Sequence, residues 1–522
     1  MPFSESHTLD ELRHHLPGQA PIREFIHHNT LHGFQDLKFF EAIFKASAIF
    51  GYQPTMPLRD FRTLFQKGRI KNDVLLRVIA ESKGSDSVSH WMHRLIEKNY
   101  DDHREPRIGN LRAEWQHVYR IQPDNYVHPL LFRIVCAYLD QGVSLERFPA
   151  DGNGFLTSIR GIERKSWVSF FRTDEVRKLF LDGNFALTSL LHKVVGDERY
   201  FEQYLFDQQF AHPGWSGMVN AVEHRPSTLM DPRPVSLREF IELELLLELD
   251  LLVSRFGNNW KPLAAYNLPD PVDLFVPAPD NELNEVLTLW QTSFEWSYYD
   301  DVISGLFAGI EANKPDNGSP NFQALFCIDE RECSLRRHLE SGPLKCQTFG
   351  TPGFFGVEFY FRQAYANHYD KLCPAPVFPK YLICEEVNGK HRSGELLYTD
   401  HAHRLLGGWL TTLTLGFAAG IKLGRNLFRP KMSPAISDAF AHMHAAGKLQ
   451  IEFVEGTENV DGLQLGFRVE EMAFRVENVL RSIGLIDNFA RFVYLVAHGS
   501  SSANNPHHSA HDCGACSGRP GS

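Results

Sequence analysis

The spacing of apolar residues changes after Pro320, and this change constrains the fold more than any other feature of the sequence. Over the first 280 residues, apolar side chains recur at helical spacing between Pro and Gly breaks. After Pro320 the apolar runs shorten to strand length and alternate with helical segments. Such alternation is typical of an α/β sheet with parallel pairings. We therefore expect a mainly helical region over residues 1–280, followed by an α/β domain over residues 281–522.

The clearest predicted helix spans residues 236–255. Ser236 and Glu239 match a capping box, and Gly257 suits a carboxyl-terminal cap. The acidic residues of this helix are interpreted as a solvated face rather than a metal patch. They are Glu242, Glu244, Glu248 and Asp250.

A Pro-rich break at residues 267–279 follows, after which Asp280 is expected to cap a long amphipathic helix. Beyond Pro320, the predicted strands are 323–328, 357–361, 381–387 and 492–497. The predicted helices of this part are 333–339, 405–423, 434–446 and 469–483.

Composition excludes several classes of function and location. A net charge of -11 argues against nucleic-acid binding, which needs a basic face. No apolar leader segment follows Met1, so the eight cysteines are expected to be reduced thiols or metal ligands in the cytoplasm. The run 409–423 is shorter than the roughly 20 apolar residues needed to cross a bilayer. It is expected to be a buried helix or a surface that docks on a membrane partner.

Two of the predicted strands end at residues that bind metals well. Cys327 lies at the end of the first strand, and His498 directly follows the strand at 492–497. Because sites in open α/β sheets form beyond the carboxyl ends of strands, we expect these two side chains to meet. Cys513 follows His498 by 15 residues and is the candidate third ligand. Two thiolates and one imidazole suit zinc and leave a fourth position open.

Asp329 and Arg331 follow Cys327 at intervals of two residues. If the extended backbone persists, alternation puts all three side chains on one side of the strand. The Asp329 carboxylate can then take the fourth zinc position, and a bidentate ion pair with Arg331 can draw it away. With the position open, zinc lowers the pKa of bound water to about 7 and produces a nucleophile at neutral pH.

Other interpretations of these residues stay open. A Cys at a strand end is often a small buried hydrophobe rather than a metal ligand. Cys513 and Cys516 could instead form a structural zinc knuckle with nearby histidines of the tail. Those histidines are His507, His508 and His511. The glycine loop at 350–356 lacks the ending of a P-loop and is expected to line a pocket.

Four motifs resemble the DabA family, the probable inorganic carbon transporter subunit. They are F-C-I-D-E-R at 326–331, G-T-P-G-F-F-G at 350–356, A-H-G-S-S-S-A-N-N-P-H-H-S-A-H-D-C-G-A-C at 497–516 and, more weakly, P-I-R-E-F-I-H-H-N-T-L-H-G-F at 21–34. Family chains usually continue for a few hundred residues beyond the last ligand, whereas this sequence stops nine residues after Cys513. That difference predicts a truncated gene product or a fragment.

The resemblance implies a β-carbonic-anhydrase-like α/β domain that holds Zn²⁺ through Cys327, His498 and Cys513. Asp329, as an exchangeable fourth ligand, and Arg331 would form a gating pair. The implied reaction hydrates CO2 to bicarbonate only when coupled to a proton-conducting membrane subunit that resembles DabB. The chain would then be peripheral, on the cytoplasmic face of the inner membrane. Two alternatives remain: a stand-alone β-type carbonic anhydrase, and a non-catalytic zinc-stabilised scaffold of a membrane complex.

Overall fold

The structure is a computed structural model. It describes residues 3–16, 31–142, 148–150, 152–276, 281–312, 319–364, 366, 368–373, 377–387, 406, 408–410, 412–413, 416, 420–421, 447–456 and 459–497.

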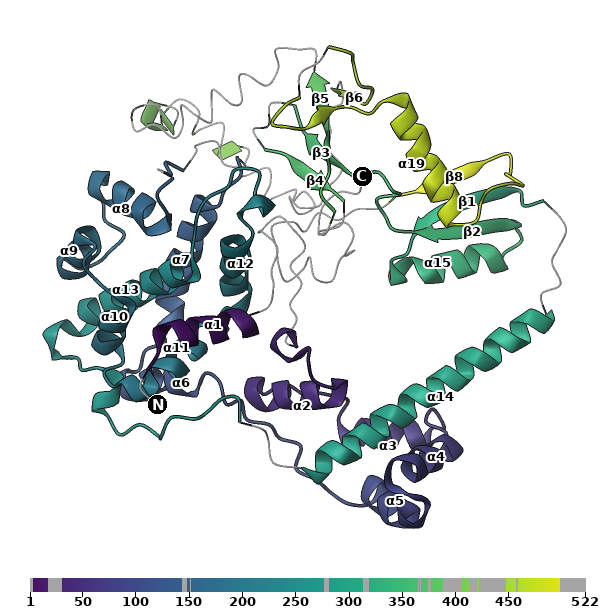
Figure 1. Ribbon diagram of the computed structural model, residues 1–522, viewed down its shortest axis with the longest axis horizontal. Coiled ribbons are helices and arrows are strands. Elements are labelled where there is room, and N and C mark those ends of the chain that lie inside the picture. The colour runs from purple at the N-terminus through teal and green to yellow at the C-terminus, as the bar shows by residue number, and fades with distance from the viewer. Residues whose placement is uncertain are drawn as a thin grey trace.

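The amino-terminal part of the described chain is helical, as the apolar spacing predicts (Figure 1). Its helices are α1 (Glu5–His15), α2 (Phe39–Phe50), α3 (Leu58–Gln66), α4 (Asn72–Lys83), α5 (Val88–Ile96), α6 (Asn110–Tyr119), α7 (Asp124–Tyr138), α8 (Phe155–Lys165), α9 (Asp174–Asp182), α10 (Leu187–Val194), α11 (Phe201–Phe210), α12 (Pro213–His224), α13 (Leu237–Phe256) and α14 (Glu282–Ala312).

Helix α13 is the centre of the larger helical core. The predicted capping box is confirmed: the Ser236 hydroxyl accepts from the Glu239 amide at 3.2 Å, and the Glu239 carboxylate accepts from the Ser236 amide at 3.1 Å. At the other end, Gly257 has a φ of 59°, which favours glycine. Helices α7, α8, α9, α10 and α12 pack against α13, so its leucines are buried all round.

The prediction that the acidic residues of α13 form a solvated face is wrong. Glu242, Glu244, Glu248 and Asp250 are all buried. Glu242 pairs with Arg238, one turn earlier in α13, at 3.3 Å. The other three carboxylates find partners on segments that are distant in sequence, which helical spacing does not reveal. Asp250, for example, accepts from the backbone amides of Arg172 and Thr173 at 2.8 and 2.9 Å, just before α9.

Helix α14 begins after Asn281, whose side chain accepts from the Leu283 amide at 2.9 Å. Asp280, the predicted cap, lies outside the described residues. The first turns of α14 pack against α3, α4 and α5 in a second core that includes Trp290. The later turns carry exposed apolar side chains, Ile310 among them, and extend away from the helical core (Figure 1).

After α14, the described chain contains two sheets and the helices between their strands. The first has the strand order β2-β1-β8, with β1 (Phe322–Cys327) paired in parallel to β2 (Cys346–Thr351) on one side and β8 (Val493–Val496) on the other. Helices α15 (Glu330–Ser341) and α19 (Val469–Ser482) lie on opposite faces of this sheet (Figure 1). The predicted α/β class with parallel pairings is thus confirmed for this sheet.

The second sheet is mixed. It has the order β4-β3-β5-β6, with β7 also paired to β5. Its strands are β3 (Phe359–Arg362), β4 (Asp370–Leu372), β5 (Tyr381–Val387), β6 (Gly447–Gln450) and β7 (Gln464–Leu465).

The run 409–423 is only partly described. The described positions between 406 and 421 are helical, and their apolar side chains are exposed, Trp409 and Leu413 by 64% and 60%. The buried alternative is therefore wrong for these positions, while the docking alternative stays a prediction. No helix in the described part of the chain is long and apolar enough to cross a membrane.

Candidate functional site

The described residues of the predicted site lie at or just beyond the carboxyl edge of the three-stranded sheet: Cys327 ends β1, and Asp329 and Arg331 follow it. Because β1 is parallel to both neighbours, all three strands end at this edge. In the register, Cys327 of β1 faces Thr351 of β2, and Phe326 faces Val496 of β8. The strand-end motif, the glycine loop and the segment that enters the tail motif therefore start side by side.

Cys327 is the buried end of the central strand, with 2% of its surface exposed. Val496, which pairs beside it, stands two residues before His498 in the sequence. Because Phe326 pairs with Val496, the end of β8 lies beside the end of β1, and His498 follows two residues later in the sequence. His498 and Cys513 themselves lie outside the described residues, as do the competing tail residues from His507 to Cys516.

Asp329 occupies the position directly before helix α15, where Asp is favoured. Its carbonyl oxygen accepts from the Glu332 amide at 3.0 Å, which closes the first helical turn. The extended backbone does not persist to Arg331, because α15 begins at Glu330. Strand alternation therefore does not position Arg331; it lies on the first turn of α15, two residues after Asp329.

The glycine loop is held tightly between the two helices of this layer. A Cβ at Gly350 would meet a guanidinium nitrogen of Arg336 at 2.7 Å, and one at Gly356 would meet Val479 of α19 at 2.7 Å. Gly356 also has a φ of +71°, a conformation that glycine adopts without strain. Phe355 is buried in the core with Leu325, so this part of the loop packs rather than lines a pocket.

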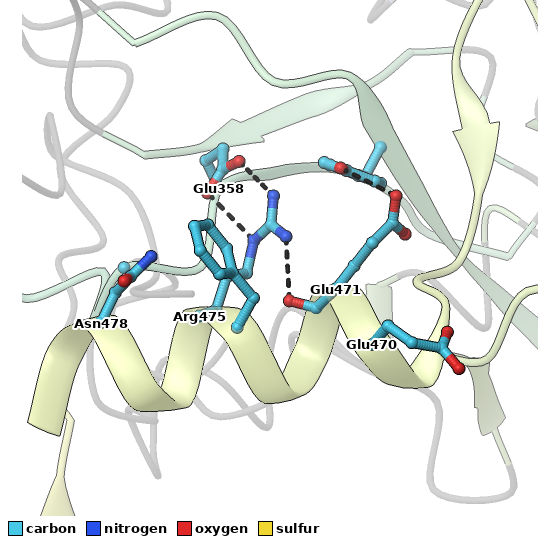
Figure 2. A pocket seen from close by; sticks show the side chains of 8 residues that line it. Glu358, Glu470, Glu471, Arg475 and Asn478 are labelled. Carbon is cyan, nitrogen blue, oxygen red and sulfur yellow. Dashed lines mark hydrogen bonds and ion pairs between the residues drawn. The ribbon is translucent and has the colours of Figure 1, made fainter.

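Gly356 does line a pocket of about 510 Å³, shown in Figure 2. Arg475 of α19 crosses it and binds Glu358, with one nitrogen–oxygen distance of 2.5 Å, while its guanidinium lies 4.6 Å from the Tyr381 ring centre. Burial alone lowers the pKa of Arg475, but the bonds to Glu358 and Tyr381 outweigh it and raise the pKa. Arg475 thus joins α19 to the segment before β3 and to β5 of the second sheet.

A separate group of metal-binding side chains lies in the helical region: His128, His212 and Glu244. No local spacing marks it, because the three residues come from different helical segments and only tertiary packing brings them together. The burial of Glu244 is part of the same arrangement that overturns the solvated-face prediction.

A model of the family described as probable inorganic carbon transporter subunit DabA matches residues 9–522. The chain belongs to the DabA family. A relative from Azotobacter vinelandii, named probable inorganic carbon transporter subunit DabA, is 48% identical over the whole chain, which covers 61% of that relative. A relative of the same name from Nitrosospira multiformis is 46% identical, again over the whole chain, which covers 57% of it.

A more distant DabA relative from Sorangium cellulosum is 27% identical over 98% of the chain. The chain thus spans about three fifths of the length of the first two DabA relatives. No solved structure matches it. Three of the motifs that resemble the DabA family, at 326–331, 350–356 and 497–516, begin in or directly after the paired strands β1, β2 and β8, respectively.

Proposed function

We propose that this chain acts in inorganic carbon uptake, as a transporter subunit with a zinc site at the carboxyl edge beyond β1. The observation that carries the proposal is the parallel register of β1 and β8. It joins a buried cysteine at one strand end to the segment that leads into His498, across more than 160 residues of sequence. The printed names of the curated relatives supply the transport role.

The donor set fits zinc. Cys327 would supply a thiolate from a dry sheet edge, and His498 and Cys513 would add an imidazole and a second thiolate. Three such ligands leave one position open, and a zinc ion there supplies the Lewis acidity that makes water nucleophilic at neutral pH. Thiolates favour zinc over magnesium or calcium, which prefer oxygen ligands.

Asp329 and Arg331 would control that open position. Asp329 stands two residues after the proposed ligand Cys327, and Arg331 occupies the first turn of the helix that follows. Asp329 could take the fourth position and close the site, or pair with Arg331 and leave that position free for water; hydration of CO2 would then yield bicarbonate and release a proton. Reversible hydration alone accumulates nothing, so uptake requires coupling to an energy source that biases the pair.

A membrane subunit resembling DabB is the proposed source of that coupling, with this chain docked on the cytoplasmic face of the inner membrane. Exposed apolar side chains support docking on another protein. They occur on the later turns of α14 and at the described helical positions between 406 and 413. Clustered exposed apolar groups of this kind mark interaction surfaces.

The zinc site is tested by comparing Cys327→Ser with Cys333→Ser. Cys333 lies exposed on α15, only six residues away, and is the matched control. We expect Cys327→Ser to lose one equivalent of zinc, and Co²⁺ substitution to lose its thiolate-to-metal absorption band, while Cys333→Ser keeps both. Equal zinc content and equal cobalt spectra in the two variants would refute the site.

The gating pair is tested by bicarbonate accumulation in cells that also express the membrane partner. Asp329→Ala and Arg331→Ala are each expected to abolish accumulation, with Asp329→Ala retaining zinc on the three remaining ligands. Unchanged uptake in both variants would remove the pair from the mechanism. CO2 hydration by the purified chain without any partner would favour the stand-alone carbonic anhydrase.

A further inference from the structure

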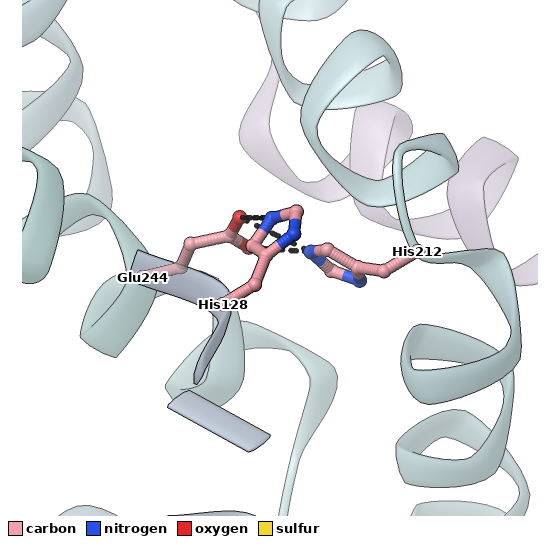
Figure 3. Close-up of side chains that lie close together, drawn as sticks. All are labelled: His128, His212 and Glu244. Atoms are coloured by element: carbon pink, nitrogen blue, oxygen red, sulfur yellow. Dashed lines mark hydrogen bonds and ion pairs between the residues drawn. The ribbon is translucent and has the colours of Figure 1, made fainter. Parts of the chain in front are cut away.

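Three potential metal ligands converge in the interior of the helical region (Figure 3). His128 comes from α7, His212 directly precedes α12, and Glu244 lies in the middle of α13. The Nε2 atom of His212 is 3.1 Å from both carboxylate oxygens of Glu244. The Nε2 atom of His128 is 3.4 Å from one of them. Glu244 is fully buried, and the side chain of His212 is 3% exposed.

The spacing of these atoms suits a single metal ion. Zinc bonds of about 2.0–2.1 Å at tetrahedral angles put neighbouring ligand atoms roughly 3.3 Å apart. One ligand atom from each of the three residues lies within 4.8 Å of the others. The two imidazole rings are nearly perpendicular, at 84°, so their nitrogens converge on the carboxylate instead of the rings stacking.

The surroundings orient the group in the way that metal sites require. The second ring nitrogen of His212, Nδ1, lies 2.9 Å from the Ser216 hydroxyl, and ligating histidines commonly bind a partner through this other nitrogen. The Gln209 amide donates to Glu244 at 3.0 Å. The Nε2 atom of His128 is buried and makes only longer contacts, 3.4 Å to Glu244 and 3.5 Å to an oxygen of Asp124, neither with the geometry of a good hydrogen bond. A buried nitrogen held by such long contacts is available to a ligand.

The balance of charge also favours a cation. The carboxylates of Glu244, Glu248 and Asp124 surround one guanidinium, that of Arg112. Carboxyl groups therefore outnumber guanidinium groups in this region, where unpaired charge is costly. A divalent ion held by Glu244 and the two imidazoles would offset that excess.

We propose that His128, His212 and Glu244 bind a divalent transition-metal ion, with Zn²⁺ as the best match to two imidazoles and one carboxylate. The site is independent of the one at Cys327 and contains no sulfur. By joining α7, α12 and α13, the ion clamps the core of the helical region. A cavity of about 640 Å³ is lined by Arg112 and Asp124, which lie 3.9 Å from Glu244 and 3.5 Å from His128, respectively.

The test uses the full chain with Cys327→Ser and Cys513→Ser, which removes the proposed thiolate site and breaks the alternative knuckle. We expect this protein to keep one equivalent of Zn²⁺, with X-ray absorption showing a nitrogen and oxygen shell that includes two imidazoles. Co²⁺ should bind without a thiolate absorption band. Absence of bound metal, or a sulfur ligand in the shell, would overturn the proposal. Because this background already lacks Cys327, the outcome does not depend on the proposed function.

Further variants in the same background assign the ligands. His212→Gln and Glu244→Gln are each expected to abolish binding of the remaining ion and the rise in melting temperature on Zn²⁺ addition. His192→Gln is the matched control, because His192 is half-exposed and lies 3.4 Å from a carboxylate oxygen of Glu198. Undiminished zinc in His212→Gln, with helicity intact, would show that another group, such as the His-rich tail, holds it. If both Gln variants misfold, the absorption spectrum of the unvaried site still decides the matter.

Discussion

Arg112 is a buried cation that contacts the carboxylates of Glu244, Glu248 and Asp124, and its replacement by methionine tests how the helical core tolerates acidic residues. Methionine keeps much of the volume of the arginine stem but removes the charge and all the guanidinium donors. We expect Arg112→Met to lower the free energy of unfolding of the helical region by about 3 to 5 kcal/mol, the cost of breaking a buried pair by deleting one partner.

The burial and contacts of Arg112 predict a loss of unfolding free energy typical of a buried ion pair, which is larger than that of a surface pair. The Arg112 side chain is 6% exposed, binds Glu248 and Asp124, and lies 3.9 Å from Glu244. Burial alone lowers the pKa of Arg112, yet the surrounding carboxylates and Tyr204 raise it well above its ordinary value, so the residue is charged. Deleting it leaves Glu244 and Glu248 buried without their cation, and an uncompensated buried charge is the dominant cost.

The assay is urea unfolding followed by far-ultraviolet circular dichroism, with a chelator present so that bound metal contributes nothing. Arg199→Met is the control, because Arg199 pairs with Asp197 at 2.9 Å but is 65% exposed. That exposed pair should contribute far less, because water and salt screen it. Adding Glu248→Gln to Arg112→Met should recover part of the loss by removing a stranded charge. Equal losses in Arg112→Met and Arg199→Met would refute the reasoning.

Three further predictions concern pH, capping and the glycine loop. Burial raises the pKa of Glu242 to about 7, so its protonated form stabilises the fold below pH 4.5 and this stability is lost as the pH rises through 7. Glu242→Gln should therefore raise stability at pH 8 by about 1 to 2 kcal/mol after allowance for partial solvent screening, with little change at pH 4 in the same unfolding assay. Ser236→Ala should cost about 1 kcal/mol by removing the cap of α13, measured by thermal unfolding; Ser236→Asp should cost less. Gly356→Ala should cost more than Gly456→Ala, because both have positive φ but only the first would meet Val479; equal urea midpoints would contradict this.

Features with a local cause were predictable from the sequence. The start and end of α13 follow from a capping box and a glycine that act within one turn. The strand at 381–387 was predicted with the bounds of β5, because an apolar, β-branched run is legible without its partners. The short apolar run at 323–328 likewise predicts β1, and it places the candidate zinc ligand Cys327 near the end of a strand.

Features that depend on partners were not predictable. Strand β2, C-Q-T-F-G-T, has no strong apolar run, and it forms because it pairs with β1 along its whole length. The segment over β7 is only two residues long and exists through its pairing to β5. Asp329 and Arg331 were assigned to an extended segment, but the helix that starts at Glu330 bends the chain between them.

The sequence by itself determined the elements, their caps and the residue types that can bind a metal, because these depend on neighbours within a few positions. Only the tertiary structure decided which of those residues are buried together. The spacing of the acidic residues in α13 predicts a solvated face, but they are buried. Arg112, His212 and backbone amides of the segment before α9 reach Glu248, Glu244 and Asp250, respectively. Likewise, Cys327 meets the approach to His498 only through the register of two parallel strands. Burial and register are set by long-range packing, and no local pattern encodes the partner on the other side.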